Sequence, residues 1–181
     1  MSRRSEREVR LQQQISVNLS DLLAYAERRA GSTADASDAL GDALEIIWRR
    51  ASRVPVDATA ARMYMFVVMR KALANVSRKT RNGGVAARRL AQELAFQAAT
   101  APDPAQRSGL SLDVSRALDE LPEAQVELVR LVHWEGFTIA EAAAIMEINA
   151  STARGRYAAA RASLRVALEA QAVDARRESR R

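Results

Sequence analysis

The stretch TIAEAAAIMEINASTARGRY, residues 138–157, decides the class of this fold. Thr138 and Glu141 have the spacing of a capping box, in which the threonine hydroxyl accepts from the Glu141 N–H and the carboxylate reaches back. We therefore expect a short helix to begin here, a turn at residues 146–149 and a longer helix from about Ala150. A short helix, a turn and a longer helix are typical of the helix-turn-helix unit that enters the major groove of DNA.

The longer helix separates a packing face from a basic face. Its packing face consists of Ala153, Ala160, Leu164 and Ala167. Arg154, Arg161 and Arg165 recur at i, i+7 and i+11 on one outer stripe, and arginine reads guanine or holds the phosphate backbone. The candidate DNA contacts are Ser151, Thr152, Arg154, Arg156, Tyr157 and Arg161. The alternative is an ordinary surface helix of a helical bundle.

Two helices are expected before this unit, over residues 111–121 and 122–134, and they form an antiparallel pair. Pro122 suits the first turn of the second helix because its missing N–H has no partner there anyway. His133 is the only histidine of the chain and lies at a helix end near Gly136. We expect it to cap or pack rather than to catalyse or to bind a metal.

The composition predicts an all-α protein of two small domains. The 181 residues include only 7 Gly and 4 Pro, and the 48% hydrophobic content is weighted to alanine. The lack of cysteine excludes disulfides, thiolate zinc sites and thiol nucleophiles. No apolar run is long enough for a signal peptide or a membrane helix, so we expect a cytoplasmic protein. We expect no cofactor.

Two breaks divide the chain, one at residues 82–84 with two glycines and one at residues 100–109 with two prolines. They predict a helical domain over residues 1–82, a flexible linker over 83–110, a helix-turn-helix domain over 111–170 and a basic tail over 171–181. Domains this small bury only about 60% of their unfolded surface, so we expect a partner to stabilise them.

The charges are concentrated in particular segments. The 28 Lys and Arg and the 22 Asp and Glu give a net charge of +6. Residues 58–82 contain six basic side chains and no acid, whereas residues 112–147 have a net charge of −6 and residues 148–181 of +5. Segments with this much positive charge make an anionic partner such as nucleic acid plausible.

The basic segment reads as one helix over residues 58–81. Its predicted core face comprises Met65, Val68, Met69, Ala72, Leu73 and Val76. The opposite arc mixes cations with Met63, Tyr64 and Val67, a mixture that suits single-stranded nucleic acid because cations hold phosphates while flat side chains contact bases. The alternative, a solvated charged face with Tyr64 packed on a neighbour, stays open.

An acidic ridge precedes this helix. Asp35, Asp38, Asp42 and Glu45 stand at i, i+3, i+7 and i+10, opposite an apolar face that includes Leu40 and Ile47. Neighbouring carboxylates repel one another, so a basic partner surface would stabilise the arrangement. The alternative is a solvated acidic face that pairs with Arg49 and Arg50. The spacing does not fit a calcium loop.

At this point the chain resembles a known family. The stretch LDELPEAQVELVRLVHWEGFTIAEAAAIMEINASTARGRYAAARASL, residues 118–164, resembles region 4 of bacterial RNA polymerase sigma factors. TADASDALGDALEIIWRR, residues 33–50, and ARMYMFVVMRKALANVSRK, residues 61–79, resemble their region 2. The order of regions and the linker match the extracytoplasmic-function group. The resemblance implies a non-enzymatic factor that binds core RNA polymerase, recognises promoter DNA, opens its strands and initiates transcription.

The resemblance also implies roles for individual residues. Residues for docking on the polymerase clamp are Asp35, Asp38, Asp42, Glu45 and Trp48. Residues for capturing and melting the minus-10 element are Arg62, Tyr64, Phe66, Arg70, Lys71, Asn75, Arg78 and Lys79. Residues for the minus-35 element include Thr152, Arg154 and Arg156. An anti-sigma factor is a further candidate partner.

The chain departs from the family pattern at several positions. Gly41 stands where glutamine is usual, Lys71 where asparagine is usual, and Glu147 replaces the glycine of the helix-turn-helix turn. A residue other than glycine there must avoid positive φ or accept a cost of about 1 kcal/mol. Two rival functions stay open: a stand-alone helix-turn-helix repressor, and a helical regulator that binds polymerase without reading DNA.

Overall fold

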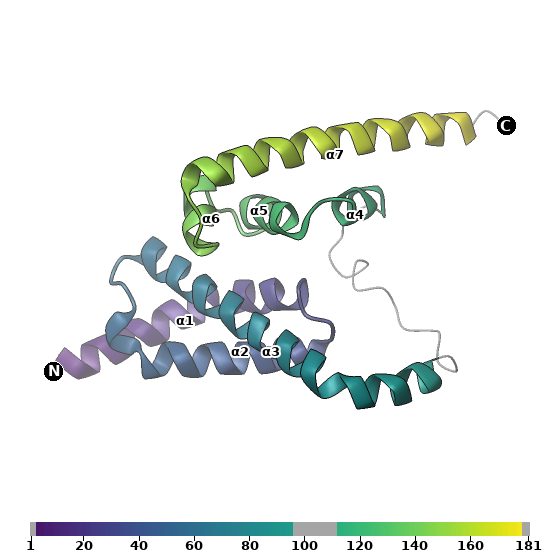
Figure 1. Ribbon diagram of the computed structural model, residues 1–181. Helices are drawn as coiled ribbons and strands as arrows, with labels where there is room; N and C mark the ends of the chain where they lie inside the picture. The colour runs from purple at the N-terminus through teal and green to yellow at the C-terminus, as the bar shows by residue number, and fades with distance from the viewer. Residues whose placement is uncertain (1–2, 96–111, 179–181) are drawn as a thin grey trace. The chain divides into compact units, whose positions relative to one another are not determined.

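The computed structural model describes residues 3–95 and 112–178, and every regular element within these ranges is helical (Figure 1). The all-α prediction is therefore confirmed. The chain divides into two compact units, Met1–Pro102 and Asp103–Arg181. No helix in the described ranges is both long enough and apolar enough to span a bilayer.

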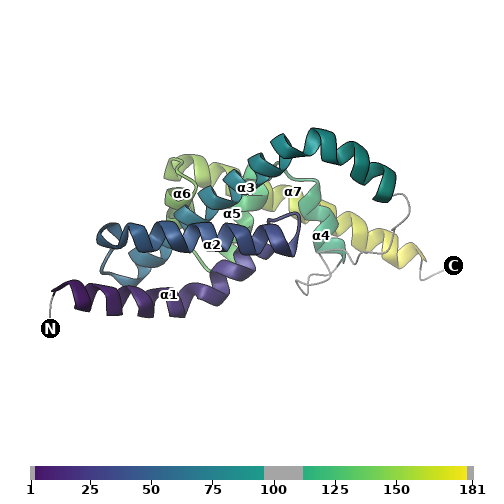
Figure 2. The ribbon, with the colours of Figure 1, turned by 90° about the horizontal axis from the view of Figure 1, so that it is seen from below.

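The first unit is built from three long helices. They are α1 (Arg3–Glu27), α2 (Thr33–Arg49) and α3 (Ala58–Ala95), with a single 3₁₀ turn at Ala51–Arg53 between α2 and α3. Figure 2 shows α1 and α2 lying side by side, and each of the three helices contacts the other two. A helix in such an arrangement buries one broad face and leaves the other to solvent.

The core of the first unit follows the predicted face of α3. All six predicted core positions of this helix are buried. Tyr25 of α1 and Phe66 of α3 are fully buried, and their rings meet edge to face with centroids 5.1 Å apart and an interplanar angle of 76°. Aromatic pairs prefer this geometry because the positive ring edge meets the negative ring face.

The start of α3 agrees with the prediction, but its end does not. Asp57 caps the first turn, since its Oδ1 accepts from the backbone N–H of Ala60 at 2.8 Å. The helix then continues through Gly83 and Gly84 to Ala95, so the expected boundary at residue 82 and the expected linker from residue 83 are wrong. Glycine weakens a helix by about 1 kcal/mol but keeps its backbone N–H, whereas proline removes it.

The second unit contains four helices in the described range. They are α4 (Leu112–Asp119), α5 (Glu123–His133), α6 (Ile139–Ile145) and α7 (Ala150–Glu178), and α7 packs against the other three. Buried Leu118, Leu121, Val129 and Ala160 form its central cluster, with Val114, Val126, Trp134, Tyr157 and Leu164 packed around it. The two helices predicted before the helix-turn-helix are present, with Pro122 at the N-cap of α5, and both pack against α7.

The last helix is longer than predicted. The basic tail was expected from residue 171, yet α7 continues to Glu178. No glycine or proline occurs after Gly155, and alanine and arginine, which favour helix, dominate the segment. The remaining predicted tail and most of the predicted linker lie outside the described residues.

Candidate nucleic-acid interface

The helix-turn-helix begins with the predicted capping box. The Thr138 hydroxyl accepts from the Glu141 N–H at 3.2 Å, and the Glu141 carboxylate accepts from the Thr138 N–H at 2.8 Å. Two backbone donors at the start of α6 are thereby satisfied. Buried Ala142, Ala143 and Ile145 then hold α6 in the unit.

The turn between α6 and α7 is a Schellman motif with glutamate in the glycine position. The Ile148 N–H donates to the Ala143 carbonyl at 3.0 Å, and the Glu147 N–H donates to the Ala144 carbonyl at 3.2 Å. Glu147 has a φ of 57°, the only positive φ of a residue other than glycine in the described part of the chain. The turn that directs α7 is therefore strained at Glu147, because a side chain with a Cβ makes this left-handed backbone unfavourable.

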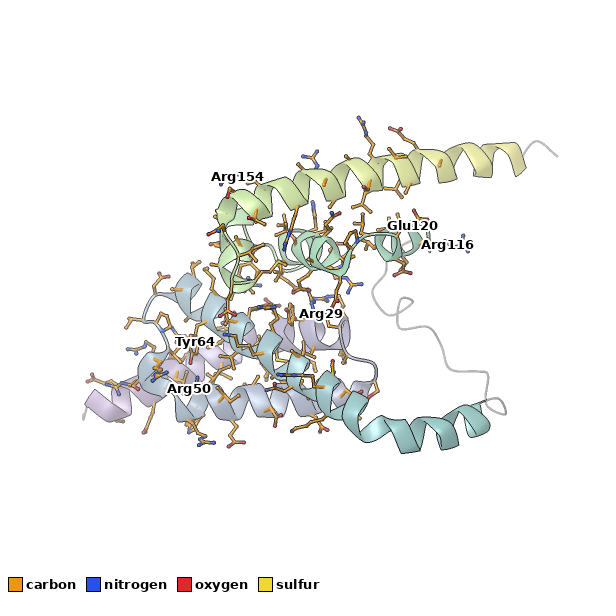
Figure 3. The ribbon with its side chains drawn as sticks, in the orientation of Figure 1. Arg29, Arg50, Tyr64, Arg116, Glu120 and Arg154 are labelled. Atoms are coloured by element: carbon orange, nitrogen blue, oxygen red, sulfur yellow. The ribbon has the colours of Figure 1, made fainter. Side chains whose placement is uncertain are left out.

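The beginning of α7 presents its predicted side chains to solvent. Ser151, Thr152 and Arg154 are exposed, while Ala153 between them is fully buried against the unit. Figure 3 shows Arg154 on the outer side of the first turn of α7. Exposed polar side chains at a helix N-terminus are suited to base edges and phosphates in a groove.

Further along α7 the predicted set divides into two groups. Arg161 is exposed, and so is Arg165, whose Nε lies 4.0 Å from a carboxylate oxygen of Glu169. Arg156 and Tyr157 are half-buried. The Tyr157 ring packs against the central cluster of the unit and is therefore partly accessible.

Tyr157 also contacts His133 at the end of α5. The Tyr157 hydroxyl lies 2.8 Å from His133 Nε2, and the two rings are stacked with centroids 6.0 Å apart and an interplanar angle of 20°. The expected packing role of His133 is confirmed. The pairing itself could not be predicted because the two residues are 24 positions apart and no local pattern joins them.

In α3 of the first unit, one predicted DNA contact is wrong. Phe66 is fully buried against Tyr25 and therefore belongs to the core rather than to a nucleic-acid surface. Residue 66 lies between the core face and the basic arc of the helix, and it is buried because α1 packs against that side. The minus-10 role that the resemblance implies for it is therefore not available in this structure.

Arg62 and Lys79 of α3 form ion pairs with acidic residues of neighbouring helices. The Arg62 guanidinium forms an ion pair with Asp21 of α1 at 3.0 Å and lies 4.9 Å from the centre of the Phe66 ring. Lys79 Nζ lies 3.9 Å from a carboxylate oxygen of Asp42 in α2. Both side chains thus connect α3 to its neighbours.

Four of the remaining predicted residues share one outer line on α3. Tyr64, Lys71, Asn75 and Arg78 stand at i, i+7, i+11 and i+14, which on a helix brings them to one side, next to the core face. We call these four residues the α3 stripe. Tyr64 is half-buried and the other three are exposed, and an Arg78 guanidinium nitrogen donates to the Asn75 side-chain carbonyl. Arg70 is half-buried at the edge of the stripe.

Tyr64 is the residue on which the two interpretations of the basic helix differ. Figure 3 places it on α3. Its side chain is only half-buried, unlike the neighbouring core residues Met65 and Phe66, which are fully buried. The α3 stripe therefore combines a partly accessible aromatic ring with cations, which is the chemistry that single-stranded nucleic acid requires.

The acidic ridge of α2 lies on the surface, as predicted. Asp38 and Glu45 are exposed, Asp35 and Asp42 are half-buried, and the Trp48 side chain is 51% exposed at the end of the helix. A Trp side chain that remains this exposed offers a large apolar contact to a partner.

Part of the charge of the ridge is balanced within the unit. Asp35 accepts from the Ser32 hydroxyl at 2.9 Å, and Glu45 pairs with Arg49 at 3.3 Å. The predicted pairing with Arg49 is thus present, and such exposed pairs contribute little stability. At Gly41, which departs from the family pattern, no atom lies within 4 Å of an added Cβ, so a longer side chain fits there.

Comparison with known proteins assigns the second unit to a family. Residues 111–164 match the family described as sigma-70, region 4. The match runs from α4 through the first half of α7 and contains the whole helix-turn-helix. The predicted resemblance is confirmed for this segment. No curated protein matches the chain significantly in sequence.

Solved structures similar to this one cover both units. The sigma factor RpoE from Bartonella quintana, in complex with the anti-sigma factor NepR, has a TM-score of 0.62 at 24% identity, over 87% of this chain and 96% of that one. CnrH in complex with the cytosolic domain of CnrY gives 0.60 at 22% identity, over 88% of each chain. PhyRSL in its complex with NepR, from Sphingomonas sp. Fr1, gives 0.59 at 20% identity, over 86% and 87%. At these identities the likeness concerns the fold.

Proposed function

We propose that this chain, whose residues 111–164 are a region 4 of the sigma-70 family, is a sigma factor of the extracytoplasmic-function group. It joins core RNA polymerase in the cytoplasm, brings it to promoters and helps to separate the strands, while the polymerase performs the catalysis. The observation that carries the proposal is the helix-turn-helix within the family match, with Ser151, Thr152 and Arg154 exposed at the start of α7.

The second unit binds the minus-35 element in this proposal. The start of α7 enters the major groove, Arg154 reads a base or holds a phosphate, and Arg161 contacts the backbone farther along the helix. This division of work follows from position, since base contacts of such units come from the N-terminal part of the recognition helix.

The first unit binds the minus-10 element through the α3 stripe. Unstacking a base step costs a few kcal/mol, and stacking a base on an aromatic side chain returns about 1–3 kcal/mol. Tyr64 is the aromatic ring of the stripe, and Lys71 and Arg78 supply cations for the phosphates of the separated strand. Arg62 and Phe66 support α3 from within the unit and are positioning residues in this account, whereas Lys79 is exposed at the surface.

The acidic ridge binds core RNA polymerase in this proposal. Asp38 and Glu45 are exposed carboxylates on one side of α2, and Trp48 adds an apolar contact at its end. A complementary basic surface on the polymerase would speed association and set the register of docking. Asp38→Lys with Glu45→Lys should abolish co-purification with core polymerase, whereas Asp119→Lys, an exposed carboxylate of α4, should leave it intact. Full retention of the double variant would reject this assignment.

An inhibitory protein partner is part of the proposal. The similar sigma factor RpoE was solved in complex with an anti-sigma factor. A chain with the same fold offers comparable surfaces, and we propose that a protein of this class controls the factor.

Transcription in vitro tests the whole proposal. Purified core polymerase is incubated with the full chain and fragmented genomic DNA, and the start sites of the transcripts are mapped. The proposal expects transcripts from specific fragments only when the chain is present. Gel shifts separate the rivals: tight duplex binding without polymerase indicates a stand-alone repressor, and polymerase binding with no effect on DNA indicates a helical regulator.

A further inference from the structure

The contact between His133 and Tyr157 joins α5 to α7 at the base of the recognition helix. Nε2 of the imidazole lies 2.8 Å from the tyrosine hydroxyl, and the rings are stacked. The Tyr157 ring is held by the central cluster of the unit, whereas His133 is exposed. The polar end of the pair therefore faces solvent while its apolar end is anchored.

Helical spacing places this pair beside the arginines of α7. Arg154 precedes Tyr157 by three residues and Arg161 follows it by four, and residues at these distances are neighbours on a helix surface. Both arginines are exposed. A hydroxyl, an imidazole and two guanidinium groups thus gather along one edge of α7, with the imidazole contributed by a different helix.

We propose that His133 and Tyr157 form a phosphate-binding pair, through which α5 adds a backbone contact beside the recognition helix. The proposal rests on the proposed function, because it needs duplex DNA to lie along α7. It assigns to His133 a binding role in addition to packing, and it assigns the predicted DNA contact of Tyr157 to its hydroxyl group.

The hydrogen-bonding chemistry of the pair makes this contact proton-linked. A neutral imidazole can accept from the tyrosine hydroxyl at Nε2, but the imidazolium can only donate. When a proton from solvent is bound, the tyrosine oxygen must accept from Nε2–H, and the hydroxyl proton becomes available for a phosphate oxygen. Protonation therefore adds both a positive charge and a donor on the side that DNA occupies.

Further charged groups stand on α5 and on the two helices that pack against it, α6 and α7. On α5 itself, Arg130 lies one turn before it, and after the helix Glu135 is buried, with 5% exposure. On α7 the flanking cations are Arg154 and Arg161. On α6, the Glu141 carboxylate is engaged in the capping box. DNA phosphate is a new negative charge in these surroundings, and it favours the imidazolium.

Because His133 is the only histidine, the experiment has a single imidazole to observe. NMR of the full chain follows the His133 ring protons from pH 5.5 to 8.0, alone and with a saturating amount of a mixed-sequence 20-base-pair duplex at low salt, where weak binding through phosphate contacts needs no polymerase. The proposal expects the titration midpoint to rise when the duplex binds, since binding and protonation must favour each other equally. An unchanged midpoint overturns it.

Duplex affinity as a function of pH gives the second measurement. The unmodified chain should bind the duplex about three- to tenfold more tightly at pH 5.8 than at pH 8.0, with a salt slope steeper by about one phosphate contact at the lower pH. His133→Gln keeps a hydrogen bond to Tyr157 without titrating and should abolish this difference. Tyr157→Phe keeps the ring and should reduce it.

The outcomes separate this inference from the proposed function. A purely structural pair predicts that both variants lose stability while the pH profile of DNA binding stays that of the unmodified chain, and this result overturns the inference. Polymerase-dependent transcription with a pH-independent duplex affinity likewise rejects the His133 contact alone. Failure of transcription itself counts against the proposed function.

Discussion

The two basic helices, α3 and α7, carry similar charge patterns but bury very different shares of their surface. In α3 the side chains Met65, Phe66 and Met69 are fully buried, and Arg62 is an ion-paired connection to α1. Within residues 150–170 of α7, only Ala153 and Ala160 are fully buried, and Arg154 and Arg161 are exposed. The comparison teaches that the neighbouring helices, and not the basic pattern alone, decide which positive side chains are available to DNA.

The largest expected effect tests the claim that Phe66 belongs to the core of the first unit. Phe66→Ala should lower the free energy of unfolding by about 3–5 kcal/mol, because it removes a fully buried ring and its contact with Tyr25. Chemical denaturation followed by circular dichroism measures the change. A loss below about 1 kcal/mol would mean that the packing of α3 differs from this description.

A smaller effect is expected at Arg154, on the exposed side of α7. Arg154→Ala should weaken promoter binding by the holoenzyme by about 1–3 kcal/mol if the guanidinium reads a base. Arg116→Ala provides the matched control, since Arg116 is an exposed arginine of α4 in the same unit (Figure 3). Equal affinity of both variants and the unmodified chain would remove Arg154 from the interface.

Tyr64 tests whether the α3 stripe acts on opened DNA. Tyr64→Ala should reduce the stability of the open complex by about 1–2 kcal/mol while leaving the closed complex unchanged, because the ring contacts bases only after they unstack. Permanganate reactivity of thymines near the start site measures opening. Tyr64→Phe, which keeps the ring, should behave as the unmodified chain, and an equal loss in both variants would argue against stacking.

The smallest effect concerns the turn before α7. Glu147→Gly should stabilise the second unit by about 0.5–1 kcal/mol, because glycine adopts the observed positive φ without the cost that a Cβ imposes. Thermal denaturation followed by circular dichroism measures this change in stability. Glu147→Ala separates backbone from charge: it removes the carboxylate but keeps the Cβ, so it should give no comparable gain.

The local signals in the sequence predicted the second unit well. The capping box, the turn and the start of α7 depend on residues within about ten positions of one another, and hydrogen bonds between such neighbours form in the same way whatever surrounds them. The positive φ of Glu147 had no local signal of its own, because glutamate does not favour left-handed backbone. The predicted ends of α3 and α7 were wrong because glycine and polar residues lower the stability of a helix without necessarily ending it.

The roles of the predicted residues in α3 were harder to assign. Arg62, Phe66 and Lys79 fit the basic pattern as well as Tyr64, Lys71 and Arg78 do. The packing of α1 and α2 brings Asp21, Tyr25 and Asp42 to Arg62, Phe66 and Lys79, and it buries Phe66 completely. These partners lie 37 to 41 positions away in the chain, beyond the reach of helical periodicity.

The sequence by itself determined that this protein is helical, that its second unit is a helix-turn-helix and that its charges gather on particular helices, because hydrophobic periodicity and capping act over a few residues. Tertiary structure decided which aromatic and basic side chains remain accessible and that His133 meets Tyr157. Burial depends on the helices that pack against a given face, and those contacts join residues that no local pattern relates.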